Sequence, residues 1–144
     1  EKTLVGEVYE IFPGSELGFT EGPHLYKFKD YYYLITAEGG TGYNHAMTCA
    51  RSKNILGPYE LDPIGHFVTA KDNPELKIQR AGHGDIVETQ DGQFYAVHLC
   101  SRPLPTIKSE HLRSPMGRES AIEKIEYTDE GWFRMSCGGN APVI

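Results

Sequence analysis

The sequence has too few cysteines for a disulfide framework. Its 144 residues contain three, Cys49, Cys100 and Cys137, and no CxxC pair that would indicate a zinc site or a redox motif. We therefore interpret them as small buried hydrophobic side chains. No apolar run approaches the length that crosses a membrane. No signal peptide is recognisable, but the chain starts at Glu1 rather than Met, so this absence leaves the compartment open.

Basic charge is also scarce. Fourteen Lys and Arg stand against 20 Asp and Glu, and the formal net charge of -6 argues against a nucleic-acid partner. Aromatic residues, by contrast, make up 11% of the chain, together with 16 Gly and nine Pro. Many aromatics interrupted by Gly and Pro favour short strands and tight turns over long helices. The length suffices for one domain with a hydrophobic core.

Two similar strand-rich units follow each other along the chain. Each opens with a Gly-rich turn into a hairpin, and two further strands follow. Strands are expected at 24–28, 31–36, 45–52 and 57–61 in the first unit, and at 84–89, 94–99, 119–127 and 132–135 in the second. Residues 4–11 read as a separate strand. A segment containing Pro63, Gly65 and Pro74 reads as a loop between the units, and 101–116 reads as a longer loop. For 119–127 the period fits a helix about as well as a strand.

Two sheets of about four strands have the size of propeller blades. A propeller needs at least about four blades to close its ring. The chain is therefore expected to be a piece of a propeller, or to assemble with other chains.

One motif carries a family resemblance. Thr20–Lys27 (TEGPHLYK), followed by Tyr31–Leu34 and Ala37–Thr41, resembles the family-43 glycoside hydrolases, above all their β-xylosidase and α-L-arabinofuranosidase members. The resemblance continues in order through Ala50–Ser52, Gly57–Glu60, Gly82–Gly84, Val97–Leu99, Arg102–Pro105, Gly117–Glu119 and Gly131–Trp132. It implies an all-β, five-bladed β-propeller of which this chain supplies about two blades. Residues 15–62 would be blade four and 80–135 blade five, within one catalytic domain.

The resemblance also implies a mechanism and a catalytic acid. Such enzymes invert the anomeric centre: a carboxylic acid protonates the leaving oxygen while a carboxylate activates water on the opposite face. The family's acid corresponds to Glu21, beside the small Gly22 and the rigid Pro23. Partial burial near another carboxylate would keep it protonated at neutral pH. From spacing alone, Glu21 would be an ordinary surface acid in a turn.

The family's other two carboxylates have no counterpart here. The general base is an Asp of blade one, and the Asp that orients the acid comes from blade three; both lie upstream of anything that matches this chain. The aspartates of the chain are interpreted mostly as turn or loop residues: Asp30, Asp62, Asp72, Asp85, Asp91 and Asp129. The isolated chain is therefore expected to lack a complete catalytic set.

Further site residues follow from the same resemblance. His83 matches a histidine near the propeller axis that helps to hold a hydrated Ca²⁺, through water because calcium prefers oxygen ligands; the alternative is a hydrogen bond within the core or to the acids. Arg118 matches an arginine that reaches the innermost sugar, or it pairs with Glu119. Thr41 would line the same pocket. Arg102 would bind substrate or anchor a loop. No cofactor is required.

The remaining candidates are given structural roles. His24 is part of the motif and could pack behind the acid, and Trp132 is expected to pack between blades rather than on a sugar. The other histidines show no ligand spacing: His45, His66, His98 and His111.

Three functions stay open. The first is inverting hydrolysis of β-xylosidic or α-arabinofuranosidic bonds in hemicellulose-derived saccharides, with xylo- or arabino-oligosaccharides as substrates and the remaining blades on another chain or segment. The second is a non-catalytic carbohydrate-binding or assembly fragment. The third is a ring of two or three copies, which would have four or six blades rather than five.

Overall fold

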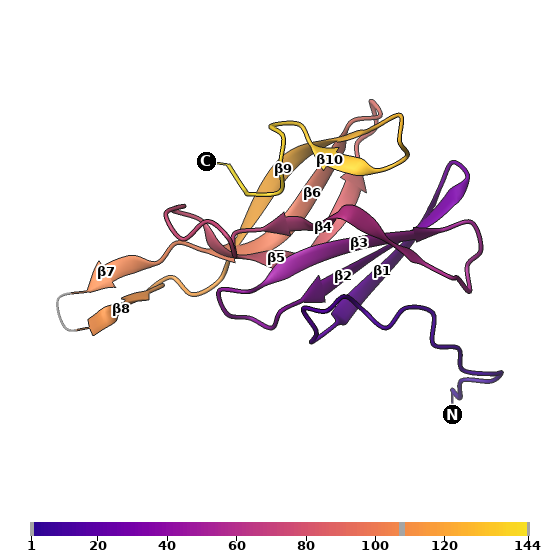
Figure 1. Ribbon diagram of the computed structural model, residues 1–144, viewed down its shortest axis with the longest axis horizontal. Coiled ribbons are helices and arrows are strands. Elements are labelled where there is room, and N and C mark those ends of the chain that lie inside the picture. Colours follow the sequence, from indigo (N-terminus) through magenta and orange to yellow (C-terminus); the bar gives the residue numbers. More distant parts are fainter. Residues whose placement is uncertain (1, 107–108, 144) are drawn as a thin grey trace.

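The computed structural model describes residues 2–106 and 109–143, with the side chains of 105–112 left aside. Within this part, all regular structure is β-strand, as predicted (Figure 1). The first sheet has the order β1-β2-β3-β4 and the second the order β10-β9-β6-β5, with all pairings antiparallel. The first comprises β1 (Glu21–Phe28), β2 (Tyr31–Glu38), β3 (Ala46–Ser52) and β4 (Glu60–Thr69). The second comprises β5 (Gln79–Glu88), β6 (Phe94–Ser101), β9 (Glu119–Tyr127) and β10 (Phe133–Met135).

A small hairpin interrupts the second sheet. Strands β7 (Leu104–Thr106) and β8 (Ser109–Arg113) pair with each other and project away from both sheets (Figure 1). Each large sheet is otherwise a four-stranded meander, the arrangement of a propeller blade. The prediction of two blade-sized units is confirmed.

An aromatic core lies between the two sheets. Phe28 of β1 contacts the rings of Phe94 and Tyr127 edge to face, at centroid distances of 5.2 and 5.0 Å. Tyr33 of β2 and Phe133 of β10 are also buried, with ring centroids 5.3 Å apart. Because both sheets bury their large side chains in one cluster, they form a single packed unit.

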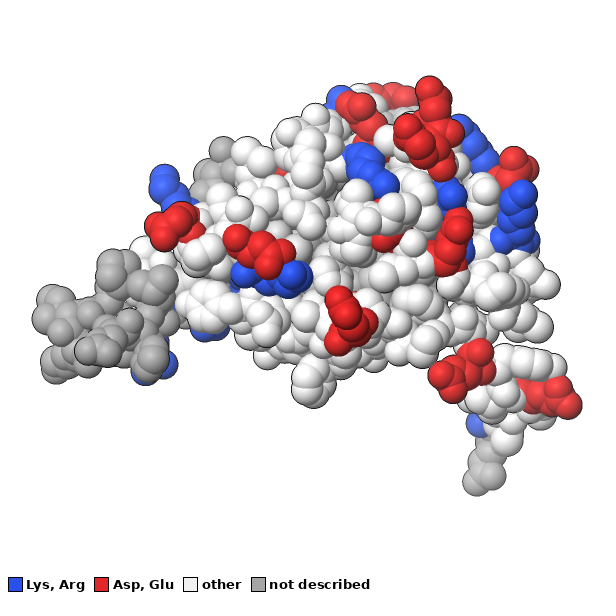
Figure 2. Space-filling view, viewed as in Figure 1, with Lys and Arg blue, Asp and Glu red and all other residues white. Residues whose placement is uncertain are grey.

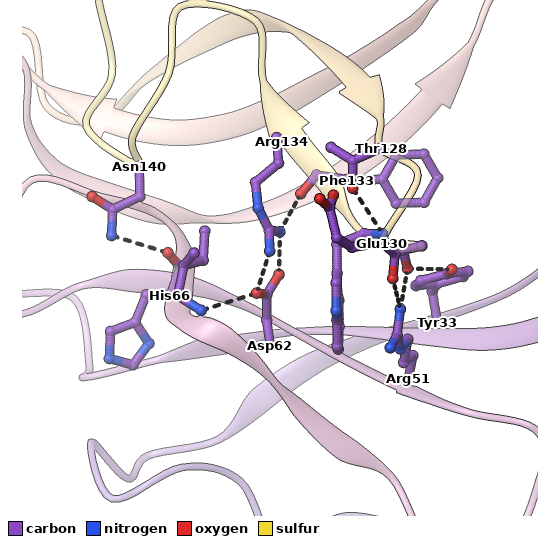
Figure 3. A network of polar contacts seen from close by, with 12 residues as sticks. Tyr33, Arg51, Asp62, His66, Thr128, Glu130, Phe133, Arg134 and Asn140 are labelled. Carbon is purple, nitrogen blue, oxygen red and sulfur yellow. Dashed lines mark hydrogen bonds and ion pairs between the residues drawn. The ribbon is translucent and has the colours of Figure 1, made fainter.

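Polar clamps join the same two sheets at their edges (Figure 3). Arg51 of β3 lies 4.0 Å from the ring of Trp132 and donates hydrogen bonds to the carbonyls of Glu130 and Gly131. Asp62 of β4 accepts two hydrogen bonds from the guanidinium of Arg134 in β10. Trp132 is 3% exposed, so the prediction that it packs between blades is confirmed.

Several local predictions were wrong. Residues 4–11 form no strand, and Leu4, Val5 and Val8 are almost fully exposed, since no neighbouring strand in the described chain pairs with them. β4 continues to Thr69 through Pro63 and Gly65, which were read as loop. It is an edge strand, where Pro removes no ladder hydrogen bond, and its pairing with β3 is shifted in register.

The second unit holds two further outcomes. The predicted loop 101–116 contains the β7–β8 hairpin. The ambiguous segment 119–127 is strand β9, which pairs with β6 from Phe94 to Cys100.

The surface carries charged side chains of both signs. Asp and Glu side chains are intermixed with Lys and Arg over the face in view (Figure 2). In the described part of the chain, no helix is long and apolar enough to cross a bilayer.

Candidate active site

The candidate residues gather at one end of the two sheets. Antiparallel pairing sets Glu21 opposite Ala37, and Glu38 opposite Ala46, so the β2–β3 turn that carries Thr41 lies at the end where β1 begins. In the second sheet, pairings of Gln79 with Ser101 and Cys100 with Glu119 align the start of β5 with the end of β6 and the start of β9. Contacts between β1 and β5, described next, show that these two ends coincide.

Glu21 and His83 meet across the boundary between the sheets. Glu21 Oε1 lies 3.9 Å from His83 Nδ1, and their side chains are 56% and 36% exposed. Gly22 makes this approach feasible, because a methyl group at its Cα would lie 2.7 Å from His83 Nε2. The burial expected for Glu21 is therefore not provided by the described chain, and His83 is its ionisable neighbour.

The start of β5 is irregular. Arg80 and His83 have φ of 53° and 44°, and the β5–β6 register shifts on both sides of Gly82. A Cβ on Gly82 would lie 2.6 Å from His45 Cδ2, so β5 packs directly on β3. Bulges and left-handed residues re-aim side chains and often occur beside functional sites. Here they turn the side chain of His83 toward Glu21.

His45 lies beside this pair. Its ring centroid is 6.4 Å from that of His83. Burial lowers the pKa of His45. Arg118 is exposed, as is Thr41 in the β2–β3 turn.

Arg102 has a protein partner. Its guanidinium forms a bidentate ion pair with Glu119, with Nε 3.0 Å from Oε2. Hydrogen bonds from Arg102 lower the pKa of Glu119. The alternative of a loop anchor therefore describes Arg102 well, and Glu119 is engaged by Arg102 rather than by Arg118.

The loop ahead of Glu21 is fixed by Glu38, which the sequence analysis missed. This carboxylate is fully buried and accepts hydrogen bonds from Ser15 N (2.7 Å), Ser15 Oγ, Thr20 Oγ1 (2.9 Å) and Thr48 Oγ1 (2.8 Å). Burial acts to raise the pKa of Glu38, but these hydrogen bonds outweigh it and lower the pKa. The sequence offered one signal for a buried carboxylate here, because Glu38 directly follows the apolar run of β2.

Two aspartates differ from their predicted setting. Asp85 lies within β5, and its Oδ2 is 3.5 Å from His24 Nδ1, so His24 also bridges the two sheets. Asp62 is buried in β4 and paired with Arg134. The turn propensity of Asp led to a wrong prediction for both residues, because contacts with His24 and Arg134 accompany their positions in strands.

A calcium ion would find few ligands on this chain. Among the described residues, no group of three or more His, Cys, Asp or Glu side chains is arranged to hold a metal. His83 offers a single nitrogen, and calcium prefers six to eight oxygens. These residues fit contact through water, with most ligands supplied from elsewhere. His111 lies outside the described side chains.

The two meanders each have the arrangement of a propeller blade, and Glu21 lies at the end that they share. The model of glycosyl hydrolases family 43 matches residues 1–133, so the chain belongs to that family. It is 51% identical over 135 residues to xylosidase/arabinosidase 43B of Humicola insolens, covering 94% of this chain and 24% of that protein. It is 46% identical to a xylan 1,3-beta-xylosidase of a Vibrio species, covering 100% of this chain and 28% of that protein.

A solved structure agrees with this assignment. The crystal structure of a xylan beta-1,4-xylosidase from Bacillus halodurans C-125 superposes with a TM-score of 0.90 at 52% identity, over 96% of this chain and 26% of that one. The chain thus spans about a quarter of the length of the relatives it matches. That its sheets are blades four and five stays a prediction.

Proposed function

We propose that the chain is part of an inverting glycosidase that hydrolyses β-xylosidic or α-arabinofuranosidic bonds in hemicellulose-derived saccharides, with Glu21 as its general acid. The observation that carries this proposal is the meeting of Glu21 and His83 at the end of the sheets that also holds the β2–β3 turn with Thr41 and the start of β9 next to Arg118. Relatives named as xylosidases support the first bond type. A non-reducing end alpha-L-arabinofuranosidase of Bacteroides ovatus, 37% identical over 95% of this chain, supports the second.

The chemistry divides between this chain and the rest of the ring. Glu21 would protonate the leaving glycosidic oxygen, and Arg118 would bind adjacent sugar hydroxyls with its planar fork. The base and the aspartate that orients the acid would come from other blades. The base must lie roughly 6.5–9.5 Å from Glu21 so that a water molecule fits between them and the sugar. Those blades would also bury Glu21, which this chain leaves more than half exposed.

His83 would orient Glu21 and, through water, hold a hydrated Ca²⁺ on the propeller axis. Such an ion would supply positive charge near the reacting sugar. The chain's own part is to keep the imidazole against the carboxylate, which Gly22 permits.

Substitution of Glu21 tests the proposal. In the intact protein, Glu21→Gln should lower kcat on unsubstituted xylo- or arabino-oligosaccharides by about 10²–10⁴-fold, the usual contribution of general acid catalysis. An aryl glycoside should lose much less, because its leaving group needs little protonation. Glu16→Gln, an exposed acid in the preceding loop, is the matched control. Unchanged turnover of oligosaccharides in Glu21→Gln would refute the assignment.

A non-catalytic fragment is the second candidate. It is favoured by the exposure of Glu21. Native mass spectrometry separates the two: a partner of roughly 150–200 residues supports a split enzyme, whereas a lone 16.1 kDa species that binds xylo-oligosaccharide supports the fragment. Dimers or trimers would indicate a ring built from copies.

A further inference from the structure

A cavity beside Arg118 is lined with arginine. It has a volume of about 480 Å³, within the usual range for ligand sites. Its walls include Arg80 from β5, Ser101 at the end of β6, Arg113 at the end of β8, Ser114 just after it, and Arg118 ahead of β9. Because Arg118 belongs to both, the cavity adjoins the candidate active site.

Three polar atoms on its walls lack partners. Ser101 is 1% exposed, and its Oγ, the Nε of Arg80 and the Oγ of Ser114 are buried without a hydrogen bond to any described residue. Buried polar groups in folded proteins are normally satisfied, because leaving them unpaired is costly. Since these three atoms are buried, they lie behind the cavity surface, and a ligand would meet the exposed side chains of Arg113 and Arg118 and the terminal N–H groups of Arg80.

The charge of the lining selects the kind of group. Three of the lining residues are arginines, and no Asp or Glu is among those that the structure describes there. A guanidinium only donates hydrogen bonds, so it matches a ligand group that only accepts. A carboxylate is such a group and pairs with arginine in a bidentate, charge-assisted geometry. A neutral sugar hydroxyl also accepts from arginine but carries no charge, so it forms a weaker hydrogen bond than a carboxylate does.

The position of Arg80 is restricted by its backbone and by an aromatic neighbour. Its backbone φ is 53°, and its guanidinium carbon lies 4.7 Å from the ring centroid of Tyr43, in the same turn as Thr41. Stacking on an aromatic face restricts a guanidinium and leaves its N–H edge available. The β2–β3 turn thereby positions both a predicted sugar-contacting residue and the charged wall of the cavity.

We propose that this cavity binds the carboxylate of an acidic saccharide, such as a xylo-oligosaccharide that bears a uronic acid side group. The proposal rests on the proposed function, since Arg118 would bind the sugar to which the acidic group is linked. It assigns Arg80 to recognition of the side group rather than to the reaction. The intact protein should therefore prefer acidic over neutral oligosaccharides.

Equilibrium binding separates this proposal from hydrolysis. The probes are a uronic acid-substituted xylotriose and the same oligosaccharide with its carboxyl group reduced to an alcohol, titrated calorimetrically into intact protein that carries Glu21→Gln. The acidic probe should bind at least about tenfold tighter, as expected for hydrogen bonds to a charged group, and added salt should shrink the difference. Arg80→Gln should abolish the preference and leave binding of the neutral probe unchanged.

The controls fix the interpretation. Arg80→Lys keeps the charge but loses the fork, so it should retain part of the preference, while Lys53→Gln, beyond the opposite end of β3, should change nothing. The proposal would be overturned if both probes bound with equal affinity, or if Arg80→Gln weakened the binding of both probes equally. It would also be overturned if a carboxylate from another blade already filled the cavity. Acetate that competes as strongly as the acidic probe would reduce it to an anion site. Absence of hydrolysis by wild-type protein with the preference intact would refute the proposed function alone.

Discussion

The pair between Asp62 and Arg134 should be a main determinant of how firmly the two sheets hold together. Asp62 has a fully buried side chain, and its Oδ2 and Oδ1 lie 2.6 and 2.9 Å from the two terminal nitrogens of Arg134. Asp62→Asn preserves the shape but removes the charge, and leaves Arg134, 24% exposed, without its counter-ion. Breaking a buried pair in this way costs about 3–5 kcal/mol. Since Arg134 retains some solvent, we expect about 3 kcal/mol.

Urea unfolding followed by the fluorescence of Trp132 measures this loss. Trp132 is the one tryptophan of the sequence, and Arg134 lies 5.9 Å from its ring, so the signal reports on the same boundary. Glu60→Gln is the matched control, because Glu60 pairs with Arg51 from the same strand but is 59% exposed; it should cost no more than about 1 kcal/mol. In a double-mutant cycle, Arg134→Met should recover much of the loss caused by Asp62→Asn.

The refuting result is specific. A change in unfolding free energy within about 0.5 kcal/mol for Asp62→Asn, the usual range of a surface substitution, would show that the pair does not join the sheets. Additive effects in the double-mutant cycle would show the same.

Three further predictions concern the site and its pH response. Glu38→Gln should loosen the loop ahead of Glu21 and lower the free energy of unfolding by about 2 kcal/mol. Amide hydrogen exchange at Ser15 and Leu17 should become faster, and unchanged exchange would contradict the anchoring role. Gly22→Ala forces a methyl group to 2.7 Å from His83 Nε2 at a φ of 56°, and should cost about 1–3 kcal/mol and displace His83; an unshifted His83 resonance would count against it. Burial lowers the pKa of His45, His66 and His98. The unfolded chain therefore binds more protons than the folded one below about pH 6.5, and the melting temperature should fall when the pH is lowered from 7.5 to 5.5. A melting temperature that does not change with pH would refute the burial of neutral histidines.

Local sequence was enough to predict the hairpins but not the limits of every strand. The turn at 29–30 and the turn at 90–93 each join two strand-like runs, and both hairpins formed as predicted. Segment 119–127 could not be assigned from its period; pairing with β6 made it a strand, with Glu123 and Ile125 on the buried side. β4 was cut short because Pro63 and Gly65 resemble loop residues unless the strand is known to lie at a sheet edge.

The site was predictable only where a motif names its residues. Glu21 and His83 were placed by the family resemblance, and the structure brings them within 3.9 Å. Glu38, Arg80 and Ser101 were missed, because each matters through neighbours distant in sequence. A buried carboxylate with donors from residues 15, 20 and 48 cannot be distinguished from a surface acid until the chain is folded.

The polar edge between β1 and β5 explains why this part of the chain retains ionisable groups in strands. Both are edge strands of their sheets, and two His–carboxylate contacts join them: Glu21 with His83, and His24 with Asp85. The aromatic core lies next to this edge, and residues buried against it would be expected to be apolar. Polar side chains that are 36–56% exposed there are stable only while water or a further polar surface faces them. We therefore expect closure of the propeller to leave water or a polar surface against β1 and β5, as the catalytic aspartates expected from other blades would do.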